Sequence, residues 1–244
     1  MSTNGSDDLA EVLTRAGLPL DNIATRQAAL PGPLRDLHRR VLTSFAGTGA
    51  PPTPTELIGW AAEHGLDLHE ALRELSRTEL VFTNPDASAV TGAVPFAAGA
   101  SAHRVRIAGG PDVFGNCAVD ALGIAAMLDR DVDVRSTDPH TGEPVTAVSR
   151  AGVWSWQPGS AVVFVGSSGP GRLTDSCCPV INFFTSAEHA EAYRATHGLS
   201  GVMLTLPDAA RAGALVFVDL LREPTTASRT PQQSDAPAVT ADEP

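Results

Sequence analysis

Cysteine is scarce in this sequence, with three residues among 244. The number is odd and the spacing lacks the Cys-x2-4-Cys pairs of structural zinc sites, so reduced thiols of the cytosol are indicated rather than a disulfide framework or a zinc site. Residues 1–8 have neither a basic lead nor an apolar run, which argues against a secretion signal. No apolar run reaches the length of a membrane span. We therefore expect a cytoplasmic protein with no membrane partner.

Basic residues are also few. The chain has 17 lysines and arginines against 28 aspartates and glutamates, which gives a formal net charge of -11. Because nucleic-acid binding depends on neutralising phosphates, no nucleic-acid partner is expected. The glycine-rich segment 166–171 lacks the Gly-Lys-Ser/Thr ending of a phosphate-binding loop, so we interpret it as a flexible loop. Its position shortly before Cys177 suggests the hypothesis that it is a lid over a site.

The first 94 residues are predicted to form helices followed by a hairpin. Apolar spacing, capping residues and glycine stops predict helices over 7–17, 33–47, 54–65 and 68–78, and a hairpin over 80–94. This order is that of a winged helix, so DNA binding has to be considered. The helix over 68–78, however, mixes its arginines with glutamates that would repel a phosphate backbone. We interpret the region as winged-helix-like, without DNA recognition.

From residue 95 the sequence changes to short β-rich runs broken by glycine and proline. Strands are predicted over 103–107, 132–135, 145–148, 161–165 and 201–206, and helices over 116–128, 187–197 and 207–221. The predicted fold is therefore α+β, with a helical winged-helix-like region over 1–94 and a mixed or antiparallel sheet domain with flanking helices over 95–222. Residues 223–244 have hardly any large apolar side chain and are predicted to be a disordered tail.

The first cysteine has an acid close to it. Asn116 is a good N-cap, which would place Cys117 in the first turn of a helix, where free backbone N–H groups favour a thiolate. Asp120 lies three residues on, on the same helix face, and its negative charge disfavours a second charge on sulfur. The two groups are therefore expected to compete for one proton. Taken alone, Cys117 could equally be an inert buried thiol.

The other two cysteines are adjacent, in a segment that ends in the apolar run Asn182-Phe183-Phe184 and is interpreted as a buried strand. Successive residues of a strand point to opposite faces, so one of Cys177 and Cys178 is expected at a site and the other in the core. A cysteine hydrolase would need a histidine base, and the sequence places none of His103, His140, His189 and His197 beside the thiols.

Two thiolates without an obvious third ligand suit a soft ion such as mercury(II) or copper(I). A carboxylic acid has no role beside a copper carrier. Breaking a carbon–mercury bond, in contrast, requires a proton delivered to carbon. The nearby acid therefore favours mercury chemistry, and a non-enzymatic chaperone or sensor for mercury or copper is the alternative.

The motifs of residues 95–217 together resemble those of the organomercurial (alkylmercury) lyase family. They are Pro95-Phe96, His103-Arg104-Val105, Asn116-Cys117-Ala118-Val119-Asp120-Ala121-Leu122-Gly123, Thr141-Gly142-Glu143-Pro144-Val145 and Cys177-Cys178-Pro179-Val180-Ile181-Asn182-Phe183-Phe184. Cys-x-x-Asp followed by Cys-Cys and Phe-Phe is the signature of that family. The helical front half resembles the family's N-terminal region by pattern alone.

The resemblance implies a mercury-detoxifying enzyme that splits R–Hg⁺ into the hydrocarbon RH and Hg²⁺. By position, the acting residues are Cys117, Cys177 and Asp120: the two thiolates hold mercury, and the aspartate relays the proton. Cys178 would then face away from the site. No organic cofactor is implied, and Hg²⁺ would remain on the sulfurs until low-molecular-weight thiols or a mercuric reductase removed it.

The chain departs from the family pattern at two positions. Many members have a further cysteine, usually taken as structural, where this chain has Asp138, so a change in the fold is expected there rather than in catalysis. The residue before the first cysteine is often methionine or tryptophan and here is Asn116, which predicts a changed pocket wall and an altered range of substrates.

Overall fold

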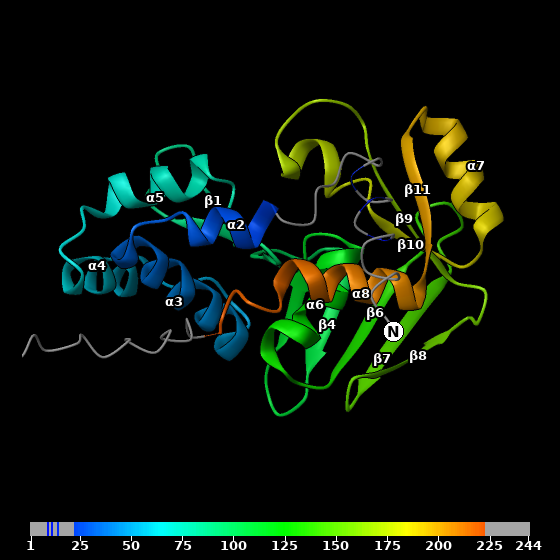
Figure 1. The fold of residues 1–244 in the computed structure, drawn as a ribbon, viewed down its shortest axis with the longest axis horizontal. Coiled ribbons are helices and arrows are strands. Elements are labelled where there is room, and N and C mark those ends of the chain that lie inside the picture. The colour runs from blue at the N-terminus through cyan, green and yellow to red at the C-terminus, as the bar shows by residue number, and fades with distance from the viewer. Residues whose placement is uncertain (1–8, 10, 12–13, 15–21, 223–244) are drawn as a thin grey trace, which may run out of the picture.

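The computed structural model describes residues 22–222 together with Leu9, Glu11 and Thr14. Most of the helix predicted over 7–17, and the whole tail predicted over 223–244, lie outside the described residues. The described helices are α2 (Asn22–Ala28), α3 (Gly32–Thr48), α4 (Pro54–Glu63), α5 (Leu68–Arg77), α6 (Ala118–Leu128), a π-helical turn (Leu173–Cys177), α7 (Ala187–His197) and α8 (Leu206–Phe217). Four of them precede the first strand and the others stand between or after later strands, which gives the α+β fold that was predicted (Figure 1).

The N-terminal helices begin at the capping residues that the sequence indicates. Thr53 and Glu56 form a reciprocal capping box, in which the Thr53 hydroxyl accepts from the Glu56 amide at 3.3 Å and the Glu56 carboxylate accepts from the Thr53 amide at 2.7 Å. The Asp67 carboxylate accepts from the Glu70 amide at 2.9 Å and caps α5. These local bonds fix where α4 and α5 start, so both predicted helix starts are confirmed.

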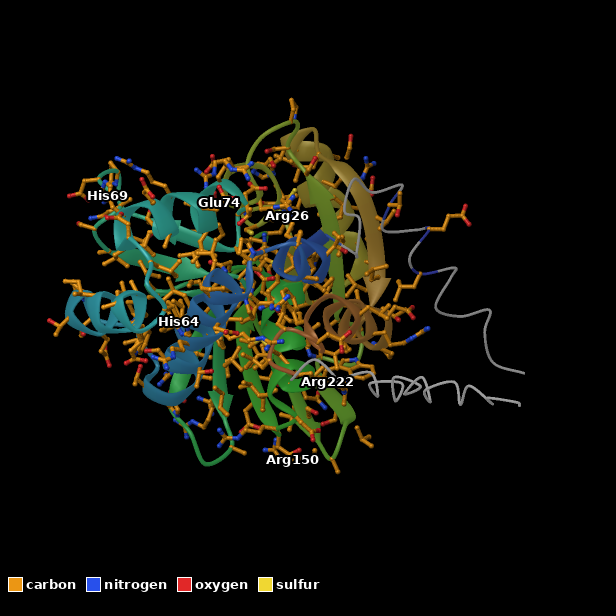
Figure 2. All side chains as sticks on the ribbon, turned by 60° about the vertical axis from the view of Figure 1, so that its left-hand side comes forward. Arg26, His64, His69, Glu74, Arg150 and Arg222 are labelled. Atoms are coloured by element: carbon orange, nitrogen blue, oxygen red, sulfur yellow. The ribbon has the colours of Figure 1, made fainter. Side chains whose placement is uncertain are left out.

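Helix α5 ends in two backbone hydrogen bonds that reverse the chain into the first strand. The Glu79 amide donates to the Ser76 carbonyl and the Leu80 amide to the Leu75 carbonyl, both at 3.1 Å. This is the Schellman pattern, in which the residue after the C-cap takes a left-handed conformation. Glu79 takes it, with φ 58°. Arg26 of α2 (Figure 2) donates to the Thr78 carbonyl at 3.1 Å, which ties α2 to this helix end.

One antiparallel sheet runs through most of the molecule, in the order β1-β2-β3-β5-β4-β6-β7-β8. Its strands are β1 (Val81–Thr83), β2 (Val90–Ala93), β3 (Phe96–Ala97), β4 (His103–Ile107), β5 (Asp112–Gly115), β6 (Val132–Thr137), β7 (Pro144–Arg150) and β8 (Val153–Gln157). The predicted hairpin is present as β1 and β2. Because β3 joins it to β5, the sheet continues across the predicted domain boundary after residue 94. The boundary itself stays a prediction.

Helices α6 and α8 pack on each other against this sheet (Figure 1). Their contact is unusually close, because Gly123 of α6 faces Gly213 of α8. A Cβ atom on Gly213 would lie 2.7 Å from the Gly123 amide nitrogen and 2.8 Å from the Val119 carbonyl oxygen. A Cβ atom on Gly123 would lie 2.2 Å from the Phe217 ring. The two glycines therefore fix the position of α6, the helix that follows Cys117.

A smaller sheet lies beside the large one and carries α7. It has the order β10-β9-β11, built from β9 (Val162–Ser167), β10 (Asn182–Phe184) and β11 (Ser200–Thr205), and all its pairs are antiparallel. The buried strand predicted at Asn182-Phe183-Phe184 is confirmed. The predicted strand does not extend back to the cysteine pair, because residues 173–177 form the π-helical turn instead. Among the helices of the described residues, none combines the length and apolar character needed to cross a membrane.

Candidate active site

Cys117 is the N-cap of α6. Its backbone is extended, with φ -148° and ψ 178°, and its Sγ accepts a hydrogen bond from the Asp120 amide at 3.4 Å. The sequence analysis placed the cap one residue earlier, at Asn116, and that prediction is wrong by one position. The sulfur thus takes the place of a capping hydroxyl and faces the free N–H groups of the first turn.

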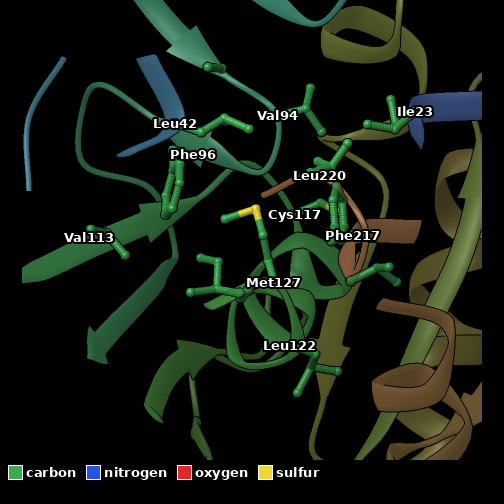
Figure 3. Close-up of a cluster of buried hydrophobic side chains, with 14 of the residues drawn as sticks. Ile23, Leu42, Val94, Phe96, Val113, Cys117, Leu122, Met127, Phe217 and Leu220 are labelled. Carbon is green, nitrogen blue, oxygen red and sulfur yellow. The ribbon is translucent and has the colours of Figure 1, made fainter. Parts of the chain in front are cut away.

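The Cys117 thiol is buried among apolar side chains. It is 3 % exposed and belongs to the core that includes Phe96, Val113 and Phe217 (Figure 3). Burial holds the pKa of the Cys117 thiol well above its usual range, and its interaction with Cys178 and the negative charge of Asp120 act in the same direction. Cys117 therefore carries its proton at neutral pH and needs a base or a metal ion to lose it.

Asp120 is the base nearest to that thiol. Its side chain is 5 % exposed, and burial raises the pKa of the carboxyl group from 3.8 to about 7, against the opposing effect of hydrogen bonding to Cys117 and Asn116. Its Oδ2 atom is buried and has no hydrogen-bond partner within the described part of the chain. A carboxyl group that titrates near neutrality, with one oxygen unused, is suited to accept and return a proton.

The cysteine pair is presented by a turn rather than by a strand. The Cys178 amide donates to the Leu173 carbonyl at 2.8 Å, which closes the π-helical turn. The alternation argument for the pair therefore does not apply. Cys178, expected to face away, is the thiol that interacts with Cys117. Cys177 is 7 % exposed and its Sγ lies 3.5 Å from the Ser176 hydroxyl. The turn conformation depends on contacts with distant residues, which no local pattern reveals.

The turn also contacts the start of α6 through the backbone. The Ala118 amide donates to the Ile181 carbonyl at 3.1 Å, and the Ile181 amide donates to the Cys177 carbonyl at the same distance. These two bonds connect Cys117 to the cysteine pair across about sixty residues of sequence. These bonds bring the segment of the cysteine pair beside the start of the helix that carries Cys117 and Asp120. The assignment of these residues to one site stays a prediction.

The histidines lie elsewhere. His103 is buried, its Nδ1 lies 2.9 Å from the Ser136 hydroxyl, and burial lowers its pKa from 6.5 to about 4, so it is a neutral core residue. His197 Nδ1 lies 2.9 Å from the Tyr193 carbonyl on its own helix. His189 of α7 has its Nδ1 atom 3.3 Å from Asp138 Oδ2. No interaction joins any of these three to a thiol in residues 22–222.

Asp138, which replaces the family's usual cysteine, organises a polar cluster. It is fully buried, and its Oδ2 accepts from the Thr185 amide at 2.8 Å and from the Thr185 hydroxyl at 2.9 Å. Its Oδ1 accepts from the His140 amide at 2.8 Å. Hydrogen bonds to Thr185 and to the His140 amide outweigh burial and lower the pKa of this carboxyl group. The substitution thus provides a local structural contact, away from the thiols.

The two larger of the surface grooves found among the described residues are not lined by a cysteine. One has a volume of about 390 Å³ and lies over the sheet at Arg106, Asp133 and Arg150. The other has a volume of about 270 Å³ and lies between α6, α8 and Trp154 of β8. Cys117 and Cys177 are instead buried, at 3 % and 7 % exposed.

Comparison with known proteins identifies this arrangement. The model of the alkylmercury lyase family matches residues 96–218, which is about half of the chain and includes Cys117, Asp120, Cys177 and Cys178. The chain belongs to the alkylmercury lyase family. It is therefore an enzyme of the carbon–mercury lyase class, as the signature residues indicated. The comparison with curated protein sequences found no match.

A solved structure shares the fold of this alkylmercury lyase family member. It is described as the crystal structure of the mercury-bound form of MerB2, and it is similar over 83 % of this chain and 98 % of its own, with a TM-score of 0.68 and 23 % sequence identity. The likeness extends well beyond the 96–218 match, so the N-terminal helices belong to the shared fold as well.

Proposed function

We propose that this organomercurial lyase cleaves the carbon–mercury bond by protonolysis, with Cys117, Cys177 and Asp120 as the acting residues. The observation that carries the proposal is the buried pair at the start of α6: a thiol that holds its proton next to a carboxyl group whose pKa is raised to about 7. Burial raises the pKa of both groups, so the thiol keeps its proton until a soft metal ion binds sulfur. The neighbouring carboxylate can then accept that proton and later give it up near neutral pH.

The proposed first step is capture of R–Hg⁺ by Cys117. As sulfur binds the soft cation, its proton moves to Asp120, which has a free oxygen. The second thiol then binds mercury, loses its own proton to solvent, and increases the electron density on the metal. The carbon–mercury bond breaks as Asp120 gives its proton to carbon. Two thiols and R–Hg⁺ thus become RH, one released proton and a mercury(II) bis-thiolate.

The second thiol is assigned to Cys177 on the family position. Cys178, rather than Cys177, interacts with Cys117 in the structure, so the pair offers two candidates for this role. Both belong to the same turn, with Cys177 as its last residue and Cys178 as its C-cap. The variants described in the Discussion distinguish them.

The site is proposed to work without an organic cofactor. Mercury is substrate and product in this scheme, since two thiolates hold Hg²⁺ after the hydrocarbon has left. Low-molecular-weight thiols or a mercuric reductase would then remove the ion by thiol exchange. A soft-metal chaperone or sensor would use the same thiols but would have no use for an acid with a raised pKa, and this favours the enzyme.

The test measures both halves of the reaction in one sample. Purified protein is incubated with an organomercurial and excess thiol, the hydrocarbon is measured in the headspace, and the intact complex is weighed by mass spectrometry. We expect many turnovers from the wild type. Asp120→Asn should still bind the organomercurial and release hydrocarbon more slowly by about 10²-fold or more, the usual effect of a lost general acid. Stoichiometric binding without turnover by the wild type would instead support the chaperone or sensor.

A further inference from the structure

The turn that carries Cys177 and Cys178 is anchored on the N-terminal helices. The Arg172 guanidinium donates to the Ser76 carbonyl at 2.8 Å and to its hydroxyl at 3.2 Å. The Leu173 amide donates to the Glu79 carboxylate at 2.8 Å, between residues 94 apart in the sequence. In Figure 1 the segment with the short helical turn lies between α5 and β9. The thiol-bearing turn is thus held from the end of α5.

Glu79 uses both carboxylate oxygens in this contact. Oε1 accepts from the Leu173 amide, and Oε2 lies 2.7 Å from the Arg26 guanidinium. The two charged side chains are only 18 % and 25 % exposed, so the ion pair is partly shielded from water. A carboxylate that is fixed by an arginine on one oxygen presents the other in a defined direction. Arg26 therefore orients the group that holds Leu173.

The backbone of Glu79 is unfavourable for a glutamate. Its φ of 58° is at the position of the Schellman motif where glycine is usual, because a Cβ atom is disfavoured in the left-handed region. Glycine would end α5 with less strain. A strained non-glycine residue persists where its side chain makes contacts that compensate, and such residues gather at functional sites. The contacts here are those with Arg26 and Leu173.

The contact continues from Leu173 to the thiols. Leu173 accepts at its carbonyl from the Cys178 amide at 2.8 Å, so its two backbone groups join the Glu79 carboxylate to Cys178. The negative charge of Glu79 also reaches Cys177, whose pKa is raised by burial first, and further by the charges of Cys178 and Glu79. A displacement of Leu173 would therefore shift both cysteines relative to Cys117.

We propose that Glu79 is a positioning residue for the cysteine pair, which fixes the orientation of the π-helical turn and thereby selects the thiol that meets Cys117. The proposal rests on the proposed lyase function for its consequence in turnover. It assigns to the N-terminal helices a part in the chemistry of a site whose reacting groups all lie beyond residue 116.

The test compares three changes at one helix end. Glu79→Gly removes the carboxylate that holds Leu173, and glycine suits the left-handed backbone at this position. Glu79→Gln keeps a side-chain oxygen that can accept from the Leu173 amide. Glu74→Gln is the control, because Glu74 belongs to the preceding helix and its side chain, 40 % exposed, pairs with Arg77. Alkylation by iodoacetamide, mapped by peptide fragmentation, gives the rates at Cys177 and Cys178 separately. Hydrocarbon release is measured on the same proteins, and thermal unfolding shows that they are folded.

We expect Glu79→Gly to change the ratio of Cys177 to Cys178 alkylation several-fold and to slow hydrocarbon release by about tenfold or more, because small displacements of reacting groups are costly. Glu79→Gln should recover most of the release and an alkylation ratio close to that of the wild type, because its side-chain oxygen can still accept from the Leu173 amide. Glu74→Gln should match the wild type. Arg172→Ala changes no residue of α5 and removes the hydrogen bonds to Ser76, so it should also change the alkylation ratio and slow hydrocarbon release. It replaces Glu79→Gly in the test if that variant does not fold.

The outcomes separate this proposal from the lyase mechanism. An unchanged alkylation ratio in Glu79→Gly, or an equal effect of Glu74→Gln, would overturn the positioning role even if the wild type turns over normally. A wild type without turnover would reject the proposed function, and the alkylation ratios would still decide the role of Glu79.

Discussion

At the scale of single residues, the buried Asp120 carboxyl group carries a cost. Its pKa is raised by burial from 3.8 to about 7, so its ionised form is disfavoured in the folded protein. The penalty is absent below about pH 4, grows as the pH rises, and is complete above pH 7, where it amounts to about 4 kcal/mol at 1.36 kcal/mol per pKa unit. Burial of Asp120 thus lowers the free energy of unfolding at neutral pH, and it leaves a carboxyl group that is partly protonated near pH 7.

This linkage predicts a pH-dependent difference between the wild type and Asp120→Asn. Asparagine has no ionised form, so the variant should gain stability relative to the wild type as the pH rises from 4 to 7, and the gain should level off above pH 7. Urea unfolding at pH 5, 6, 7 and 8 measures it, and the gain should reach an order of magnitude of a few kcal/mol. A difference that is constant over this range would show that Asp120 titrates normally.

The cysteines give a second prediction at this scale. Cys117→Ser and Cys177→Ser should each abolish hydrocarbon release, because serine binds mercury weakly, and Cys178→Ser should keep much of it. The assignment follows the family position and opposes the interaction of Cys178 with Cys117 in the structure. Release should be compared in all three variants under excess thiol. Equal losses in Cys177→Ser and Cys178→Ser would show that both thiols of the turn take part.

How far the sequence predicts the site differs among its residues. Cys117 and Asp120 come together through helix spacing, a local property, and their pairing was predictable. The turn at Cys177 depends on Glu79 and Arg172, which hold it through contacts with α5. Such long-range contacts leave no periodic trace. The one local signal for a role of Glu79 is that the helix predicted over 68–78 ends without a glycine.

At the scale of elements, a close contact between α6 and α8 holds the helix that follows Cys117. Helices approach this closely only where both faces have small residues, and here Gly123 and Gly213 meet. The contact holds α6 against the sheet, so the N-cap thiol and Asp120 one turn later cannot shift independently of α8.

Glycine substitutions in two helices should therefore have opposite effects. Gly213→Ala should destabilise the protein by about 1–3 kcal/mol through overpacking, although alanine favours helix. Gly59→Ala in α4, where an added Cβ meets nothing within 4 Å, should stabilise it by up to about 1 kcal/mol. Chemical unfolding of both variants gives the comparison. Stabilisation by Gly213→Ala would mean that α8 can move away from α6.

The element boundaries show what local chemistry determines. Thr53, Asp67 and Ser186 were predicted as helix starts, and each caps a helix through a side-chain oxygen. Helix α2 and strands β3, β5 and β8 were not predicted. Strand β8 alternates exposed and partly buried residues at a sheet edge, and its Val153 is 72 % exposed, so it depends on pairing with β7 rather than on burial.

At the scale of the whole molecule, the N-terminal helices and the catalytic region share one sheet. Strands β1 and β2 belong to the N-terminal region predicted over residues 1–94. They are connected through β3 to β5, which belongs to the region predicted over residues 95–222. Anchors from Glu79 and Ser76 to the turn add further contacts between the two regions. A chain connected in this way is expected to unfold as one cooperative unit.

The three tryptophans allow a direct measurement of that cooperativity. Trp60 lies in α4, and Trp154 and Trp156 lie in β8, at opposite ends of the molecule. Fluorescence of Trp60→Phe and of the double variant Trp154→Phe/Trp156→Phe should give the same urea midpoint as circular dichroism once differences in stability between variants are allowed for. A fluorescence midpoint that differs from the circular dichroism midpoint of the same variant would show that the predicted boundary near residue 94 divides independent folding units.

The close packing of α6 on α8 also affects which substrates can enter the site. One side of the site is rigid, so the room for the organic group has to come from the opposite side, where the cysteine turn is held by a few polar bonds to α5. A methyl group and a phenyl group would then differ greatly in how far the turn must yield to admit them. Selectivity among organomercurials would be a mechanical property of that turn, set at Glu79 and Arg172, rather than of the helix that performs the chemistry.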